Sequence, residues 1–182
     1  MTKFSHQLTG ISLGVSLSLL THNPTYLLTC YVGSLFPDVD TLWNSFNSYR
    51  SKWYGHRGIT HSLLIPLFLS FVVAVVFVGV KLKLIPTFTI YSSQLAVVRL
   101  LPDLLAGFTA GYWLHVLLDS MSPSGVPKKL SYYPRFKLWT LYRTGEPIDY
   151  LLAISLSLTF LTFSVLLSLP YLQRLTTFLT AL

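Results

Sequence analysis

The sequence predicts an all-α protein, a polytopic bundle of transmembrane helices with four or five spans, the first two of them short. The first observation is composition, because 52% of the residues are hydrophobic and 10% are charged. The mean hydropathy of +0.59 is higher than a soluble globule needs. Residues 58–80 and 150–172 each run for 23 residues without Asp, Glu, Lys or Arg. About 20 helical residues, rising about 1.5 Å each, cross the roughly 30 Å of bilayer hydrocarbon. A length of 182 residues suits a single domain over residues 1–182.

The first apolar stretch, residues 4–37, carries no formal charge over 34 residues. It is too long for one crossing and barely long enough for two. Asn23-Pro24 interrupts it, and proline removes a backbone donor and favours a turn. We therefore expect two short spans, 6–21 and 25–36, with a re-entrant hairpin as the alternative. The stretch is too long for a secretory signal peptide and no small-residue cleavage pattern follows, so we expect it to be retained.

Three further spans are expected at residues 60–80, 102–121 and 150–172. The span 102–121 is apolar except for three ionisable side chains, Asp103, His115 and Asp119. Residues 87–101 either extend this helix or lie along the membrane interface. Asp103 falls toward the opposite end of the span from the other two, where a structural role is expected.

The basic residues are divided unequally between the two sides that these spans define. The N-terminus and the loops 37–59 and 122–149 share one side, which carries nine of the thirteen Lys and Arg residues. Positively charged loops stay in the cytoplasm, so this side is predicted to be cytoplasmic. The net charge of +7 is then explained by orientation and by anionic lipid headgroups, and no nucleic-acid partner is expected.

His115 and Asp119 are four residues apart on a predicted helix, so their side chains lie on one face about one turn apart. That spacing can present an imidazole and a carboxylate to one metal ion or to two adjacent ions. The alternative is a buried histidine that hydrogen-bonds to Asp119. An ionisable pair inside a membrane segment is costly unless it faces a polar cavity, which favours a functional role.

Asp38 and Asp40 follow Pro37 at the end of an apolar stretch. Extended backbone would direct both carboxylates to one side. Hard oxygen ligands of this kind suit divalent cations and sometimes bridge two of them. The alternative is a helix N-cap or a polar helix end.

His56 and His61 are five residues apart, which is the wrong spacing for one helix face. If Gly58 breaks the backbone, His61 can occupy the first turn of the next helix while His56 reaches in from the loop. Thr60 and Ser62 are candidate helix caps, and Arg57 could hold an anionic group such as phosphate. The alternative is an interfacial basic loop.

His6, at the start of the first span, falls on the same membrane face as the motifs above. His22 alone among the histidines falls on the far side. Glu146 and Asp149 precede the last span, where either could act as a general base, support a ligand or pair with Arg143. Seven residues are therefore predicted metal ligands: His6, Asp38, Asp40, His56, His61, His115 and Asp119.

Four segments of the chain resemble a family of bacterial membrane-bound metal-dependent hydrolases, some described as inner-membrane proteins under LexA (SOS) control. They are Ser5-His6, Leu35-Phe36-Pro37-Asp38-Val39-Asp40, His56-Arg57-Gly58-Ile59-Thr60-His61-Ser62 and Gly111-Tyr112-Trp113-Leu114-His115-Val116-Leu117-Leu118-Asp119. A more distant resemblance is to helical zinc-dependent phospholipases C and nucleases, which place His-x-x-x-Asp helices around a zinc cluster. The resemblance implies a metal-dependent hydrolase.

The sequence thus predicts a multi-pass inner-membrane hydrolase whose site faces the cytoplasm. One or two divalent ions, zinc being the expected metal, would activate water against a lipid phosphoester. Arg57 and Glu146 are the expected catalytic residues. One alternative is a transporter or metal-handling protein that lines a path with the same residues, and another is a regulatory or structural membrane protein.

Overall fold

The computed structural model describes residues 1–39, 59–82, 95–128, 135–138 and 140–180. This part of the chain is mostly helical, which confirms the predicted helical class in its coarse form. The helices are α1 (Lys3–Thr21), α2 (Thr25–Leu35), α4 (Leu64–Lys81), α5 (Leu95–Ser120) and α6 (Pro147–Thr180), with short 3-10 turns η1 (Phe36–Asp38) and η2 (Ile59–His61). An antiparallel pair of two-residue strands, β1 (Val126–Pro127) and β2 (Arg135–Phe136), was not predicted.

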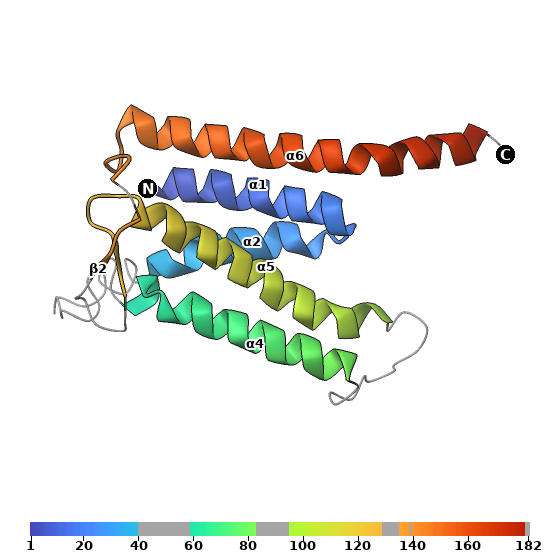
Figure 1. Cartoon of the computed structure of the whole chain (residues 1–182), viewed down its shortest axis with the longest axis horizontal. Coiled ribbons are helices and arrows are strands. Elements are labelled where there is room, and N and C mark those ends of the chain that lie inside the picture. Colours follow the sequence, from blue (N-terminus) through green and yellow to red (C-terminus); the bar gives the residue numbers. More distant parts are fainter. Residues whose placement is uncertain (40–58, 83–94, 129–134, 139, 181–182) are drawn as a thin grey trace.

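The helices lie side by side and alternate in direction, as Figure 1 shows. α1 packs between α6 and α2, and α5 packs against α2 and α4. One end of the bundle therefore gathers the start of α1, the end of α2, the start of α4, the end of α5 and the start of α6. Segments far apart in the sequence, including those that carry the predicted ligands, meet at that end.

The closest helix contact joins α2 to α5 and depends on glycine. A methyl group at Gly111 would overlap the carbonyl of Cys30, and one at Gly33 would overlap the carbonyl of Phe108. Gly107 and Gly111 form a Gly-x-x-x-Gly pair on α5. Small residues at this spacing let helix backbones approach closely, which is the usual way that helices associate in membranes. This contact fixes how α2 is positioned along the axis of α5. It therefore also fixes where Asp38, just after α2, lies relative to His115 and Asp119 on α5.

The break between α1 and α2 lies where Asn23-Pro24 predicted it. α1 ends at Thr21, His22 adopts a left-handed conformation with φ 54°, and α2 starts at Thr25. The turn is held by Asp103 of α5, whose Oδ2 accepts a hydrogen bond from Asn23 Nδ2 at 2.6 Å. Asp103 Oδ1 accepts another from the Tyr26 hydroxyl at 3.1 Å. Asp103 therefore joins the α1–α2 turn to α5 at the end away from the ligands.

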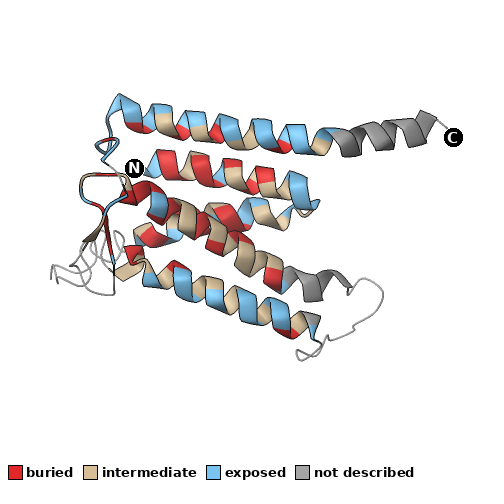
Figure 2. Ribbon diagram, viewed as in Figure 1, coloured by how far each residue is buried: buried red, intermediate tan, exposed pale blue. Residues whose placement is uncertain are grey.

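Much of α4 and of the described part of α6 is exposed (Figure 2), and the exposed residues there include many large apolar ones. In the described part of the chain, one helix is long and apolar enough to cross a membrane, residues Pro147–Leu169 of α6. α4 contains a shorter apolar helix, Leu64–Val80. The predicted helices are therefore present. Among the described residues, helix length and hydropathy support one membrane span, in α6, of the four or five predicted.

Candidate metal centre

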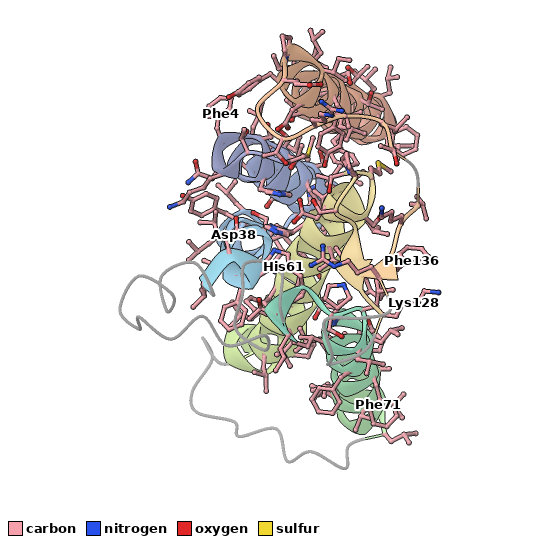
Figure 3. All side chains as sticks on the ribbon, turned by 90° about the vertical axis from the view of Figure 1, so that its left-hand side faces the viewer. Phe4, Asp38, His61, Phe71, Lys128 and Phe136 are labelled. Carbon is pink, nitrogen blue, oxygen red and sulfur yellow. The ribbon has the colours of Figure 1, made fainter. Side chains whose placement is uncertain are left out.

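The candidate site lies at the end of the bundle where α1 begins and α5 ends (Figure 1). Asp38 comes from η1, His61 from η2, and His115 and Asp119 from the last turns of α5. Figure 3 looks onto this end, where Asp38 and His61 lie beside each other. The structure thus brings together predicted ligands from three separate segments of the chain.

His115 is oriented by the backbone of α2. Its Nδ1 donates a hydrogen bond to the carbonyl of Ser34 at 2.6 Å. Ser34 lies in the last turn of α2, where carbonyl groups lack partners within the helix, and Pro37, three residues on, has no N–H to return. With its proton on Nδ1, the imidazole presents the lone pair of Nε2 to the cluster. Metal-binding histidines are held in this way by a carbonyl or carboxylate on the other ring nitrogen.

His61 is positioned by a short 3-10 turn, and this corrects the prediction that it occupies the first turn of the following helix. Tyr112 of α5 donates its hydroxyl hydrogen to the carbonyl of Thr60, which fixes the turn against α5. Ser62 Oγ accepts a hydrogen bond from Leu64 N–H at 3.2 Å, but Leu63 occupies the N-cap position of α4, so the predicted caps Thr60 and Ser62 are wrong. His61 faces the cluster from a turn that is separate from α4.

Asp38 also lies in a 3-10 turn, whereas extended backbone was expected at this position. Pro37 at the first turn presets the helical φ angle there, so the chain continues as a tight helix beyond α2. Asp38 is the one member of the cluster with appreciable exposure, at 17% of its side chain, against 0% for His61 and 2% for Asp119. Asp38 is therefore the cluster member most open to solvent.

The ligand atoms of these four residues lie at nearly equal distances. His61 Nε2 is 3.2 Å from His115 Nε2, 3.5 Å from Asp38 Oδ1 and 3.4 Å from Asp119 Oδ2. His115 Nε2 is 3.7 Å from each of the same two oxygens. Four ligands at roughly 2.0–2.1 Å from a tetrahedral ion lie about 3.4 Å from one another. The five distances are close to edges of such a tetrahedron.

The four groups have the chemistry of cation ligands. Ionised carboxylates only accept hydrogen bonds, and His115 Nε2 is an acceptor because Nδ1 donates. With neutral imidazoles the two carboxylates carry a charge of −2, of which the Met1 ammonium at Asp119 balances one. A divalent cation would bring further positive charge to the point that the four groups face.

The Asp38 carboxyl stays ionised in this environment. Its burial raises its pKa, but the hydrogen bond from His61 and the nearby imidazoles of His115 and His6 outweigh burial, so the pKa lies below its ordinary value. An ionised Asp38 is a competent metal ligand at neutral pH.

The second oxygen of Asp119 faces α1. His6 Nε2 lies 3.2 Å from Asp119 Oδ1, and the Met1 amino group lies 2.6 Å from the same oxygen. Thr2 caps the first turn of α1, and its backbone N–H donates to Asp149 Oδ2 at 2.8 Å. These contacts place the predicted ligand His6 at the cluster.

Three of the remaining predicted residues, Asp40, His56 and Arg57, lie outside the described residues. Glu146 is exposed in the turn before α6, and its catalytic role stays a prediction.

The Ser34 carbonyl and the Tyr112 hydroxyl were not predicted from the sequence, because both act through hydrogen bonds to or from backbone. Pro37 was the available signal for Ser34, since a proline lacks the N–H that would otherwise bond a helix-end carbonyl.

The comparisons with known proteins agree with a membrane location. The family model described as "YdjM inner membrane protein" matches residues 1–179. The chain belongs to this family. The YdjM inner membrane proteins of Escherichia coli (strain K12) and Shigella flexneri are each 32% identical to it over 123 residues, which cover 63% of this chain and 52% of theirs. The chain thus spans about half the length of the curated relatives it matches. No solved structure matches it.

Membership of the YdjM family confirms the predicted inner-membrane protein in its coarse form. The family is described by its location and not by a reaction. The predicted hydrolase activity, metal and substrate accordingly rest on the site itself.

Proposed function

We propose that this member of the YdjM family is a metal-dependent hydrolase of the inner membrane that cleaves a lipid phosphoester at the cytoplasmic face. The observation that carries the proposal is the set of four ligand atoms, from Asp38, His61, His115 and Asp119, spaced 3.2–3.7 Å apart in the five pairs given above. Two imidazoles and two carboxylates that converge at this spacing form a common ligand set for zinc.

Zinc fits the donor set best. Two imidazole nitrogens and two carboxylate oxygens at tetrahedral spacing suit its coordination, whereas calcium and magnesium prefer six or more oxygens. A bound divalent ion would acidify water and polarise a phosphoryl oxygen. Asp38, on the exposed side of the cluster, would face the entering substrate. Arg57 would hold its anionic group and Glu146 would serve as general base.

The surface around the site supports a lipid substrate. Each of three ligands has an exposed apolar neighbour in the chain: Phe4 lies two residues before His6, Phe36 two residues before Asp38, and Leu64 three residues after His61. Exposed basic side chains lie at the same end, at Lys3, Lys128, Lys137 and Arg143. Apolar and basic side chains together suit the boundary between acyl chains and anionic headgroups. We infer that α1, α2, α4, α5 and α6 provide the four or five spans and that this end faces the cytoplasm.

The proposal is tested on purified full-length protein prepared without chelators. Metal content is measured by elemental analysis, and hydrolysis is screened with phospholipid vesicles that contain anionic lipids. The wild type is expected to hold stoichiometric zinc and to release a phosphate-containing product. His61→Ala should lose both properties, whereas the control Asp103→Asn, at the other end of the bundle, should keep both. Wild-type protein without stoichiometric metal overturns the proposal.

A transporter that used the same residues would behave differently in that experiment. It would move metal ions across sealed vesicles and leave the phosphoesters intact. A metal flux without hydrolysis would overturn the hydrolase proposal and support a transporter.

A further inference from the structure

The imidazole rings of His6 and His115 are stacked, with centroids 3.6 Å apart and planes at 14°. Both rings are buried, His6 at 1% and His115 at 0% exposure. Two nearly parallel rings at this separation can direct ring nitrogens side by side, toward two neighbouring points. A single ion needs its ligands to converge on one point, so stacked ligand rings favour two positions.

Asp119 offers one carboxylate oxygen to each of these rings. Its Oδ1 lies 3.2 Å from His6 Nε2, and its Oδ2 lies 3.7 Å from His115 Nε2 and 3.4 Å from His61 Nε2. The two oxygens therefore belong to different groups of ligands. Each of two overlapping groups, His6 with His115 and Asp119, and Asp38 with His61 and His115, has ligand atoms within 4.8 Å of one another.

We propose that the site holds two divalent ions bridged by the carboxylate of Asp119. This proposal rests on the proposed function and deepens it. The first ion takes Asp38, His61, His115 and Asp119 Oδ2, and the second takes His6 Nε2 and Asp119 Oδ1. Hydrolytic two-metal sites place their ions about 3.5–4 Å apart, close to the spacing of the stacked rings. Such pairs can hold both the attacking and the leaving oxygen of a phosphoester, as they do in phosphatases and nucleases, which suits the substrate class of the proposed function.

The second position already attracts a positive charge. The amino group of Met1 lies 2.6 Å from Asp119 Oδ1, on the oxygen that faces His6. The second ion would displace the Met1 ammonium group and balance the negative charge of the same oxygen. Its remaining coordination positions would be available to water or substrate.

The two ions should differ in affinity. His115 is oriented by the Ser34 carbonyl, whereas His6 Nδ1 is buried and has no hydrogen-bond partner among the described residues. A partner on the second ring nitrogen typically contributes 10- to 100-fold to metal affinity. The ion at His6 is therefore the weaker one and leaves first when a chelator is added.

The test counts ions in three full-length proteins loaded with zinc and titrated with a chelator. The wild type should hold two ions per chain and lose them in two steps. His6→Ala should hold one ion and lose it in the single, tighter step. The control His22→Asn changes a histidine at the opposite end and keeps a residue that tolerates the left-handed backbone there. It should behave like the wild type.

The outcomes separate this inference from the proposed function. One ion per wild-type chain, unchanged by His6→Ala, overturns the bridged pair and leaves the hydrolase proposal standing. No bound ion overturns both. Should His6→Ala fail to fold, manganese-loaded wild type decides the question by electron paramagnetic resonance. A spin-coupled spectrum supports two adjacent ions, and a spectrum of isolated Mn²⁺ at saturating metal overturns them.

Discussion

Two polar clusters lie at opposite ends of the same bundle, and their hydrogen bonding differs. At the far end, both oxygens of Asp103 accept hydrogen bonds, from Asn23 Nδ2 and from the Tyr26 hydroxyl. At the near end, two carboxylates and two imidazoles, from Asp38, His61, His115 and Asp119, face one another at 3.2–3.7 Å in the five pairs given above. The first cluster joins one carboxylate to ordinary hydrogen-bond donors, whereas the second gathers four groups that are all common metal ligands. Convergence of ligand atoms, and not the mere presence of buried polar residues, distinguishes a candidate site from a structural contact.

The largest effect is expected from removing a ligand at the near end. Asp119→Asn replaces a charged oxygen that faces both His61 and His115. Metal affinity should fall by more than the 10- to 100-fold that is typical of outer-shell changes, because a direct ligand is lost. Competition with a chromogenic chelator measures the affinity. An affinity within threefold of the wild type would contradict the assignment.

The second prediction concerns the stability of the near end with and without metal. Zinc at 1,000 times its Kd should stabilise the wild type by about 4 kcal/mol, since it binds the folded state. In Asp38→Asn this gain should largely disappear, because a charged ligand is lost. The metal-free variant should be somewhat less stable than the metal-free wild type at neutral pH, because the lowered pKa of Asp38 means that folding favours its ionised form. Thermal unfolding in detergent, with and without zinc, gives both comparisons. A gain from zinc in Asp38→Asn equal to that of the wild type would contradict the assignment of Asp38 as a ligand.

The third prediction tests the close contact between α2 and α5. Gly111→Ala places a methyl group against the backbone of α2, which should cost about 1–3 kcal/mol of unfolding free energy. It should also displace the Ser34 carbonyl from His115 and lower metal affinity by about 10- to 100-fold.

Gly107→Ala is the matched control for that variant. Gly107 lies one turn farther from the site and faces the side chain of Thr29 rather than backbone. Gly107→Ala should reduce stability but should lower metal affinity less than Gly111→Ala does. Equal losses of affinity in the two variants would show that α2 does not set the orientation of His115.

The smallest effect is expected at the far end. Asp103→Ala removes the acceptor for Asn23 and Tyr26 and should cost about 1 kcal/mol, since these groups are only partly buried and water can replace the carboxylate. Metal affinity and stoichiometry should be unchanged. A loss of metal in this variant would show that the two clusters are coupled and would weaken the contrast between them.

Much of the fold followed from local signals in the sequence. Asn23-Pro24 predicted the break between α1 and α2, and the long uncharged runs predicted α4 and α6. The four-residue spacing of His115 and Asp119 predicted a shared helix face, because that relation depends only on helix geometry. The gathering of His6, Asp38 and His61 at one end followed from alternating helix directions.

Other features depend on contacts between distant backbones, which side-chain patterns do not reveal. The carbonyl of Ser34 orients His115, yet nothing in the side chain of Ser34 indicates this role. The close approach of α2 to α5 was overlooked, although Gly107 and Gly111 offered a signal for it. The 3-10 turn at Asp38 was mistaken for extended backbone because an Asp-x-Asp pattern also fits a strand.

The most direct test of the central claim is X-ray absorption spectroscopy of the zinc-loaded protein. The account predicts four or five nitrogen and oxygen ligands at about 2.0–2.1 Å, with the outer-shell scattering of imidazole. His61→Ala should lower the imidazole contribution or release the metal, and His22→Asn should leave the spectrum unchanged. Zinc surrounded by water alone, or a wild-type spectrum without imidazole scattering, would contradict the convergence of these side chains on an ion.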